Sequence, residues 1–205
     1  MSKKLLIIIP CFFLSNIILS SDGAAIIQEK KSGTITGTIK VKGVRDAGDI
    51  VVYLEKVEGV FIPSEEKPVL DQKNMIFIPH ILPVLVGTTV KFPNSDNVTH
   101  NVFSPSPTKK FNLGTYASGV VRELTFDDPG VIAILCNVHA EMSAFIVVLE
   151  NPYFALTGPD GKFTINNVPA GTYKIITWHE KLKENKQEVT VSAKETVTID
   201  FNLSR

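Results

Sequence analysis

Cysteine and histidine are scarce in this chain of 205 residues, and neither sign of charge is in excess. Lysine plus arginine number 21, as do aspartate plus glutamate. No basic run or basic patch with interleaved aromatics occurs, so no nucleic-acid partner is predicted. After the first 19 residues, no apolar run approaches the roughly 20 residues that a membrane-spanning helix needs, so no membrane span is predicted in the mature form.

The one long apolar run lies at the start of the chain. Lys3 and Lys4 precede Leu5–Leu19, which is almost wholly apolar, and several small residues follow. This layout is typical of a secretory signal peptide, and we expect residues 1–24 to be removed. An uncleaved membrane anchor is the alternative, which the shortness of the run disfavours. The predicted location is therefore periplasmic or otherwise extracytoplasmic.

Removal of the signal would leave a single cysteine. Cys11 lies inside the apolar run, so Cys136 would be the only thiol of the mature protein. A lone thiol in an oxidising compartment cannot form an internal disulfide. It is then either a buried, inert cysteine or a thiol that binds something.

Apolar residues that alternate with polar ones predict strands from residue 33 onward. Gly/Pro turn signals separate these segments, and no stretch shows a convincing helical period, so Lys181–Gln187 is expected to be a solvated loop. The predicted fold class is all-β, a sandwich or barrel. The expected strands are Ile35–Val41, Ile50–Leu54, Met75–Ile78, Thr89–Phe92, Val131–Cys136, Ala144–Leu149, Phe163–Ile165, Tyr173–Trp178, Val189–Val191 and Val197–Leu203.

Four residues form a candidate metal site. Cys136, His139 and Met142 follow one expected strand at intervals of three, and His100 follows another. A thiolate, two imidazoles and a thioether suit one copper ion that changes oxidation state, with Met142 as the weak axial ligand. Zinc binding or an empty site is the alternative. A thiol nucleophile with a histidine base is disfavoured because no orienting acid is apparent.

The Cys-x-x-His-x-x-Met loop, the His100-Asn101-Val102 segment and Gly87–Phe92 resemble the cupredoxins, the blue (type 1) copper proteins of the amicyanin and plastocyanin type. The resemblance covers about residues 75–150 and implies a Greek-key barrel over residues 70–150. It also implies that His100, Cys136, His139 and Met142 are the copper ligands. Asn101 would tie the two ligand loops together through hydrogen bonds.

The same resemblance implies how electrons would reach the site. The edge of His139 would face solvent, and Val138, Ala140 and Ala144 would form an apolar rim for a partner. His80, where the family more often has another residue type, is expected to lie outside the ligand set.

The flanking segments resemble another family. Asp160–Ile165, Val168–Tyr173 and the C-terminal strand are similar to the carboxypeptidase regulatory-like domain, a transthyretin-type β-sandwich. That family opens with a strand like Gly33–Ile39. We therefore expect residues 33–66 and 151–205 to form one small sandwich in which the copper domain is inserted, or to which it is joined. The Trp178-His179-Glu180 cluster is expected to pack at a strand end, with an electron route or metal site as the alternative.

The predicted function is that of an exported one-electron carrier between redox proteins, such as a dehydrogenase or cytochrome and an acceptor. It is not expected to be an enzyme, because four histidines cannot supply a second, catalytic copper site. The alternative is a periplasmic copper-binding or delivery module without a redox role. A structural β-module with a vestigial site is a third possibility.

Overall fold

The computed structural model describes residues 17–19, 25–27 and 31–205. All regular elements in these ranges are strands, which confirms the all-β prediction. Of the predicted signal peptide, only β1 (Ile17–Leu19) is described; it pairs antiparallel with β2 (Ala25–Ile27), and the rest lies outside the described residues. Within these ranges there is no helix that could span a membrane.

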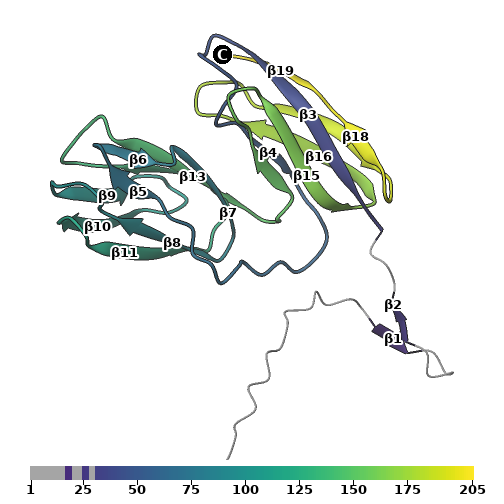
Figure 1. Cartoon of the computed structure of the whole chain (residues 1–205), viewed down its shortest axis with the longest axis horizontal. Coiled ribbons are helices and arrows are strands. Elements are labelled where there is room, and N and C mark those ends of the chain that lie inside the picture. Colours follow the sequence, from purple (N-terminus) through teal and green to yellow (C-terminus); the bar gives the residue numbers. More distant parts are fainter. Residues whose placement is uncertain (1–16, 20–24, 28–30) are drawn as a thin grey trace, which may run out of the picture.

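Two sheets packed face to face form a sandwich (Figure 1). One has the order β14-β4-β16-β17; the other has the order β15-β3-β18, and β19 also pairs with β3. Alternate residues of β3, such as Ile35 and Ile39, enter a core that they share with Phe201. The strands are β3 (Ser32–Lys42), β4 (Val51–Leu54), β14 (Phe154–Leu156), β15 (Lys162–Pro169), β16 (Gly171–Trp178), β17 (Asn185–Val191), β18 (Thr196–Thr198) and β19 (Phe201–Ser204).

The chain leaves this sandwich and returns to it at the same place. Phe154 of β14 pairs with Tyr53 of β4, although about 100 residues separate them in the sequence. The Leu54 amide donates to Tyr153 O at 3.0 Å, and the Asn151 side chain donates to Leu54 O at 2.8 Å. The intervening strands are therefore inserted between β4 and β14.

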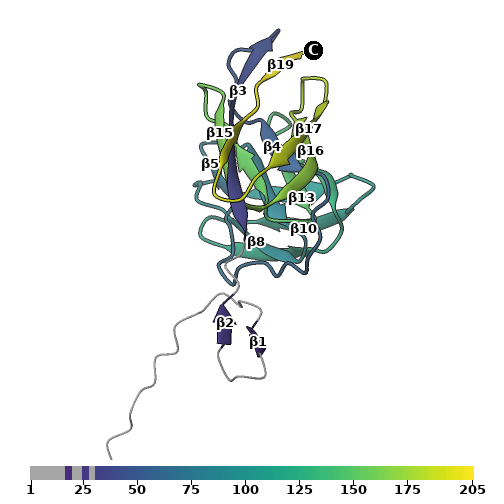
Figure 2. The ribbon, with the colours of Figure 1, turned by 90° about the vertical axis from the view of Figure 1, so that its right-hand side faces the viewer.

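The inserted strands form a barrel beside the sandwich (Figures 1 and 2). Its five-stranded sheet has the order β10-β9-β12-β13-β7, and the pairs β8-β11 and β5-β6 lie opposite. Ile132 and Ile134 of β12 lie in a separate core with Phe92 and Phe126. The strands are β5 (Asp71–Lys73), β6 (Ile76–Ile78), β7 (Ile81–Leu85), β8 (Thr88–Pro93), β9 (His100–Ser104), β10 (Phe111–Tyr116), β11 (Val121–Phe126), β12 (Gly130–Leu135) and β13 (Ser143–Leu149).

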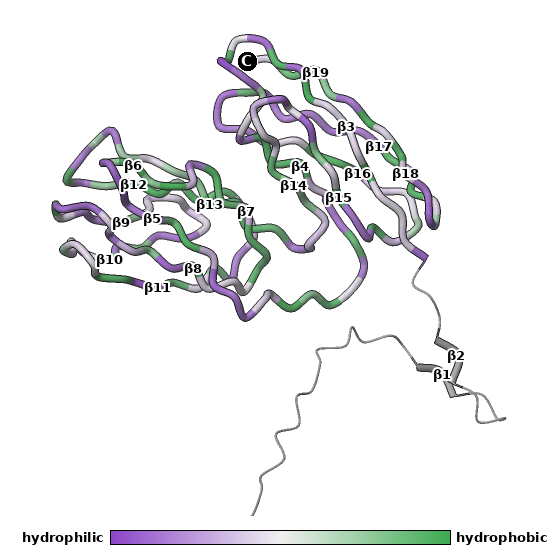
Figure 3. The backbone as a smooth tube through the Cα atoms, viewed as in Figure 1, coloured by the Kyte–Doolittle hydropathy of each residue, from purple (hydrophilic) through white to green (hydrophobic). Residues whose placement is uncertain are grey.

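A third apolar cluster joins the two units. Val147 and Leu149 of β13 pack with Val51 of β4 and Ile81 of β7, and Trp178 of β16 packs against them. Figure 3 shows hydrophobic segments along β7 and β13, on the side of the barrel near the sandwich.

Two expectations about single elements are wrong. Lys181–Gln187 is not entirely loop, because β17 begins at Asn185. Its charged residues lie at the edge of the sheet, while later residues, Val189 and Val191, hold the strand to the core. The expected continuous strand Val197–Leu203 is divided into β18 and β19, and between them the side chain of Asp200 accepts a hydrogen bond from a β3 amide.

Candidate metal centre

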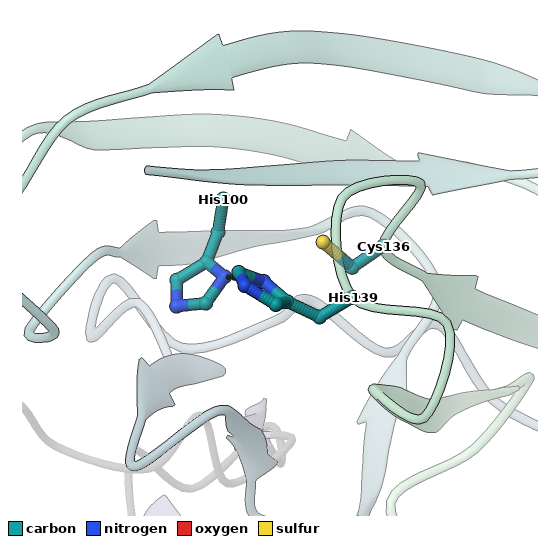
Figure 4. A group of neighbouring side chains, drawn as sticks. All are labelled: His100, Cys136 and His139. Atoms are coloured by element: carbon teal, nitrogen blue, oxygen red, sulfur yellow. Dashed lines mark hydrogen bonds between the residues drawn. The ribbon is translucent and has the colours of Figure 1, made fainter. Parts of the chain in front are cut away.

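Three of the four predicted ligands meet at one end of the barrel. His100 begins β9, Cys136 follows β12, and His139 lies in the loop before β13. Because β9 and β12 are neighbours in one sheet, a histidine and a cysteine 36 positions apart are brought side by side. One ligand atom of each of the three residues lies within 4.8 Å of the other two, and Figure 4 shows them pointing toward a common space.

His100 is fully buried, and its two ring nitrogens have different partners. Nε2 lies 2.7 Å from Asp96 Oδ2, and Nδ1 lies 3.0 Å from Nδ1 of His139. A carboxylate only accepts, so Nε2 carries the proton of neutral His100 and Nδ1 keeps a free lone pair. A carboxylate that orients a histidine in this way is typical of metal sites in proteins.

Asp96 is itself held by a turn of another hairpin. The amides of Asn74 and Met75, in the turn between β5 and β6, donate to its two oxygens at 2.6 and 2.8 Å. Burial raises the pKa of Asp96, but hydrogen bonds from the Met75 amide, His100 and the Asn74 amide outweigh it, and the pKa lies below its usual value. The carboxylate is therefore ionised and accepts all three bonds.

Asp96 was not among the residues predicted from the sequence. The available signal was its position in the loop after an expected strand, four residues before His100. That spacing alone does not show that the side chain turns back toward the ring.

The thiol and thioether lie in the barrel core. Cys136 and Met142 are both buried there, and Cys136 Sγ lies 3.5 Å from the amide of Asn101. The ligand loop closes on itself, because the Cys136 amide donates to Met142 O at 3.3 Å and the Met142 amide donates to His139 O at 3.1 Å. The axial role of Met142 stays a prediction.

Asn101 links the ligand segments through its main chain. Its side-chain Nδ2 points elsewhere and donates to Asn112 Oδ1 of β10 at 2.8 Å. Its own Oδ1 is buried and is among the few side-chain atoms of the described residues without a hydrogen-bond partner. The contact with Cys136 is thus made by the amide, and the side chain joins β9 to β10.

The predicted apolar rim is present only in part. His139 is half-buried, Val138 is 46% exposed and Ala140 is exposed. Ala144 cannot belong to the rim, because it is fully buried in the barrel core. The prediction failed there because Ala144 is the second residue of β13, where alternate side chains point inward.

The donor set fits copper. One cysteine sulfur and two imidazoles are ligands that suit copper in both of its oxidation states. Within residues 31–205, His100, Cys136 and His139 are the one group of three or more His, Cys, Asp or Glu side chains close enough to hold a metal. His80 lies apart from them, as expected, and instead contacts Ser143 O and Glu180.

Comparison with known proteins gives two kinds of similarity. A family model for the carboxypeptidase regulatory-like domain matches residues 142–204. A reduced amicyanin variant is 25% identical, covering 42% of this chain and 84% of its own, with a TM-score of 0.39. A purple cupredoxin from Nitrosopumilus maritimus is 26% identical, covering 40% and 99%, with a TM-score of 0.36. No curated protein matches the chain.

A copper-containing nitrite reductase from Thermus scotoductus is 21% identical over 55% of this chain and 28% of its own, with a TM-score of 0.41. The predicted all-β class is confirmed, and the match over residues 142–204 agrees with the predicted resemblance of the C-terminal segment to the regulatory-like domain. The family match starts at Met142, before β13, although β13 pairs with barrel strands. The predicted domain boundaries therefore stay a prediction.

Proposed function

We propose that this protein binds one copper ion through His100, Cys136 and His139, with Met142 as the axial ligand, and carries one electron at a time between redox proteins. The observation that carries the proposal is the orientation of buried His100, whose Nδ1 faces His139 while Asp96 holds Nε2. Bound copper would supply the change between two oxidation states that electron transfer needs.

The chain's own residues would position the ligands and keep out water. Asp96 holds the His100 ring in the tautomer that leaves Nδ1 unprotonated. The Asn101 amide lies against the sulfur of Cys136, where it would stabilise a thiolate. Burial of Cys136 and Met142 excludes solvent from one side of the cluster, while half-buried His139 is the ligand nearest to a partner.

A closed site favours a carrier over a delivery protein. Three of the four proposed ligands are buried. The loop that carries Cys136, His139 and Met142 is closed by its own main-chain hydrogen bonds. A carrier needs such rigidity, because its ligands must stay in place in both oxidation states. We further propose that the protein is not an enzyme, that it acts outside the cytoplasm, and that its partner is a cytochrome or a dehydrogenase.

The test is to add copper(II) to the purified metal-free protein and to record its visible spectrum. A thiolate bound to copper(II) should give an intense visible band, which should vanish on reduction and return on reoxidation without loss of metal. Release of copper on reduction would support the delivery function instead. Absence of the band, with equal binding of zinc, would contradict the blue-copper site.

A further inference from the structure

The strand that follows the ligand loop lies between the barrel and the sandwich. β13 begins at Ser143, directly after Met142. Ala144 and Ile146 point into the barrel core, whereas Val147 lies in the cluster shared with the sandwich. A displacement of β13 relative to the sandwich would therefore move Met142.

His80 joins the start of this strand to the sandwich. It immediately precedes β7, which pairs parallel with β13, and its main-chain oxygen accepts from the Phe145 amide at 2.9 Å. Its ring Nδ1 lies 3.1 Å from Ser143 O. Its Nε2 lies 3.0 Å from Glu180 Oε1, just beyond the end of β16. The His80 imidazole thus bridges Ser143, the residue after Met142, and Glu180 of the sandwich.

Aromatic contacts support the same bridge. The ring of Phe145 meets the ring of His80 edge-on, with 5.9 Å between centroids. It also meets the ring of Trp178 at 5.6 Å, again at a steep angle. Phe145 is therefore flanked by His80 on the barrel side and by Trp178 of the sandwich, and this packing limits the positions open to the imidazole.

Each ring nitrogen of His80 faces a hydrogen-bond acceptor. Ser143 O and the Glu180 carboxylate are both acceptors, and a neutral imidazole has only one N–H. Both bonds form together only when both ring nitrogens are protonated. Lys181 Nζ lies 3.0 Å from the same Glu180 oxygen. Burial raises the pKa of Glu180, but the hydrogen bonds from Lys181 and His80 lower it by more than burial raises it. The pKa therefore lies below its usual value, and the carboxylate is ionised.

We propose that His80 is a positioning residue through which the sandwich fixes Ser143, the residue that follows the Cys136–Met142 loop. The Glu180–His80–Ser143 chain keeps the start of β13, and with it Met142, at a constant distance from the other ligands. The axial methionine bond of a blue-copper site is long and weak, so the protein sets the position of that sulfur. This inference rests on the proposed function.

The test compares the reduction potential and the visible spectrum of three variants. His80→Phe removes both hydrogen bonds but keeps an aromatic ring against Phe145, and Glu180→Ala removes the sandwich end of the chain. Both should raise the potential, in the direction expected for a weaker Met142 bond. Glu180→Gln should stay near wild type, because its amide can donate to neutral Nε2 while Nδ1–H still donates to Ser143 O.

Charge alone predicts a different pattern. If only charge mattered, His80→Phe would not raise the potential, and Glu180→Gln would shift it as much as Glu180→Ala does. Either result would overturn the proposal. The double variant His80→Phe/Glu180→Ala should shift the potential no further than His80→Phe alone, since both changes break one chain.

Hydrogen exchange of the metal-free protein separates this inference from the proposed function. Exchange of the Phe145 amide should be several-fold faster in His80→Phe and Glu180→Ala than in Glu180→Gln. Equal exchange in all three variants would overturn the positioning role even if copper binds normally. A missing copper band in the wild-type protein would refute the proposed function, while the exchange rates would still report on the chain.

Discussion

The barrel and the sandwich bury their polar side chains in different ways. In the sandwich, buried Asn151 and Thr157 donate to main-chain carbonyls of the segments beside them. In the barrel, buried Asn94 likewise donates to main-chain carbonyls, but buried His100 bonds to the side chain of Asp96. A buried polar group needs a partner to offset its lost hydration. The sandwich uses such groups to hold its own backbone, and the barrel adds to them a buried histidine that a carboxylate orients toward the metal cluster.

The largest expected effect is on the barrel alone. Cys136→Ser should abolish the visible band, because oxygen cannot replace the soft thiolate. The sandwich should be unaffected, since its core is separate. Absorption and bound-metal content after copper addition measure the effect. A band that persists in this variant would show that the cysteine is not a ligand.

A matched pair of core truncations tests the comparison next. Ile35 lies in the sandwich core and Ile134 in the barrel core, and both are fully buried. Replacement of either with alanine should cost about 2–5 kcal/mol of unfolding free energy, measured by urea denaturation. Only Ile134→Ala should also speed the loss of copper to a chelator. Equal rates of loss in the two variants would mean that the site depends on both cores alike.

Asp96 should have a smaller effect, confined to the site. Asp96→Asn removes the carboxylate that orients His100 and should lower copper affinity roughly 10- to 100-fold, the usual effect of losing such a partner. Competition with a copper chelator measures it. Asp128→Asn is the control, because Asp128 is exposed and precedes the far end of β12. A similar loss in both variants would contradict the orienting role.

Acid should separate copper binding from folding. The folded-state pKa of Asp96 is lowered, so the stability it contributes is present above its ordinary pKa of about 3.9 and is lost as pH falls through the lower folded value. Protons compete for imidazole ligands at higher pH than this. The copper band should therefore disappear before the circular dichroism of the strands changes. Simultaneous loss of both signals would contradict this order.

The smallest effect on binding is expected for the axial ligand. Met142→Leu fills nearly the same volume in the barrel core, and the bond it removes is weak. Copper should remain bound and coloured, while the reduction potential rises because copper(II) loses more donation than copper(I). Voltammetry of the variant measures the shift. An unchanged potential would show that Met142 is only a core residue.

Local patterns in the sequence predicted many of the strands and the loop that bears the candidate ligands. The alternation in Ile35–Val41 predicted the long strand β3, and the spacing of Cys136 and His139 placed both on one loop after a strand. β5 was missed because its three residues, Asp-Gln-Lys, include no apolar side chain, and β14 because it is too short to show an alternation. β7 was missed as well, since it contains Pro83 and both of its faces are partly covered.

The sequence alone determined the types of the candidate ligands and the all-β class, because both depend on residue identity and on spacing over a few positions. Only the tertiary structure decided that His100 would lie beside Cys136 and that Asp96 would turn back to its ring, since strand pairing and loop closure set those distances. It alone placed His80 against Glu180, 100 positions away. Such contacts depend on how two separate cores pack together. The periodicity of a single segment cannot predict that packing.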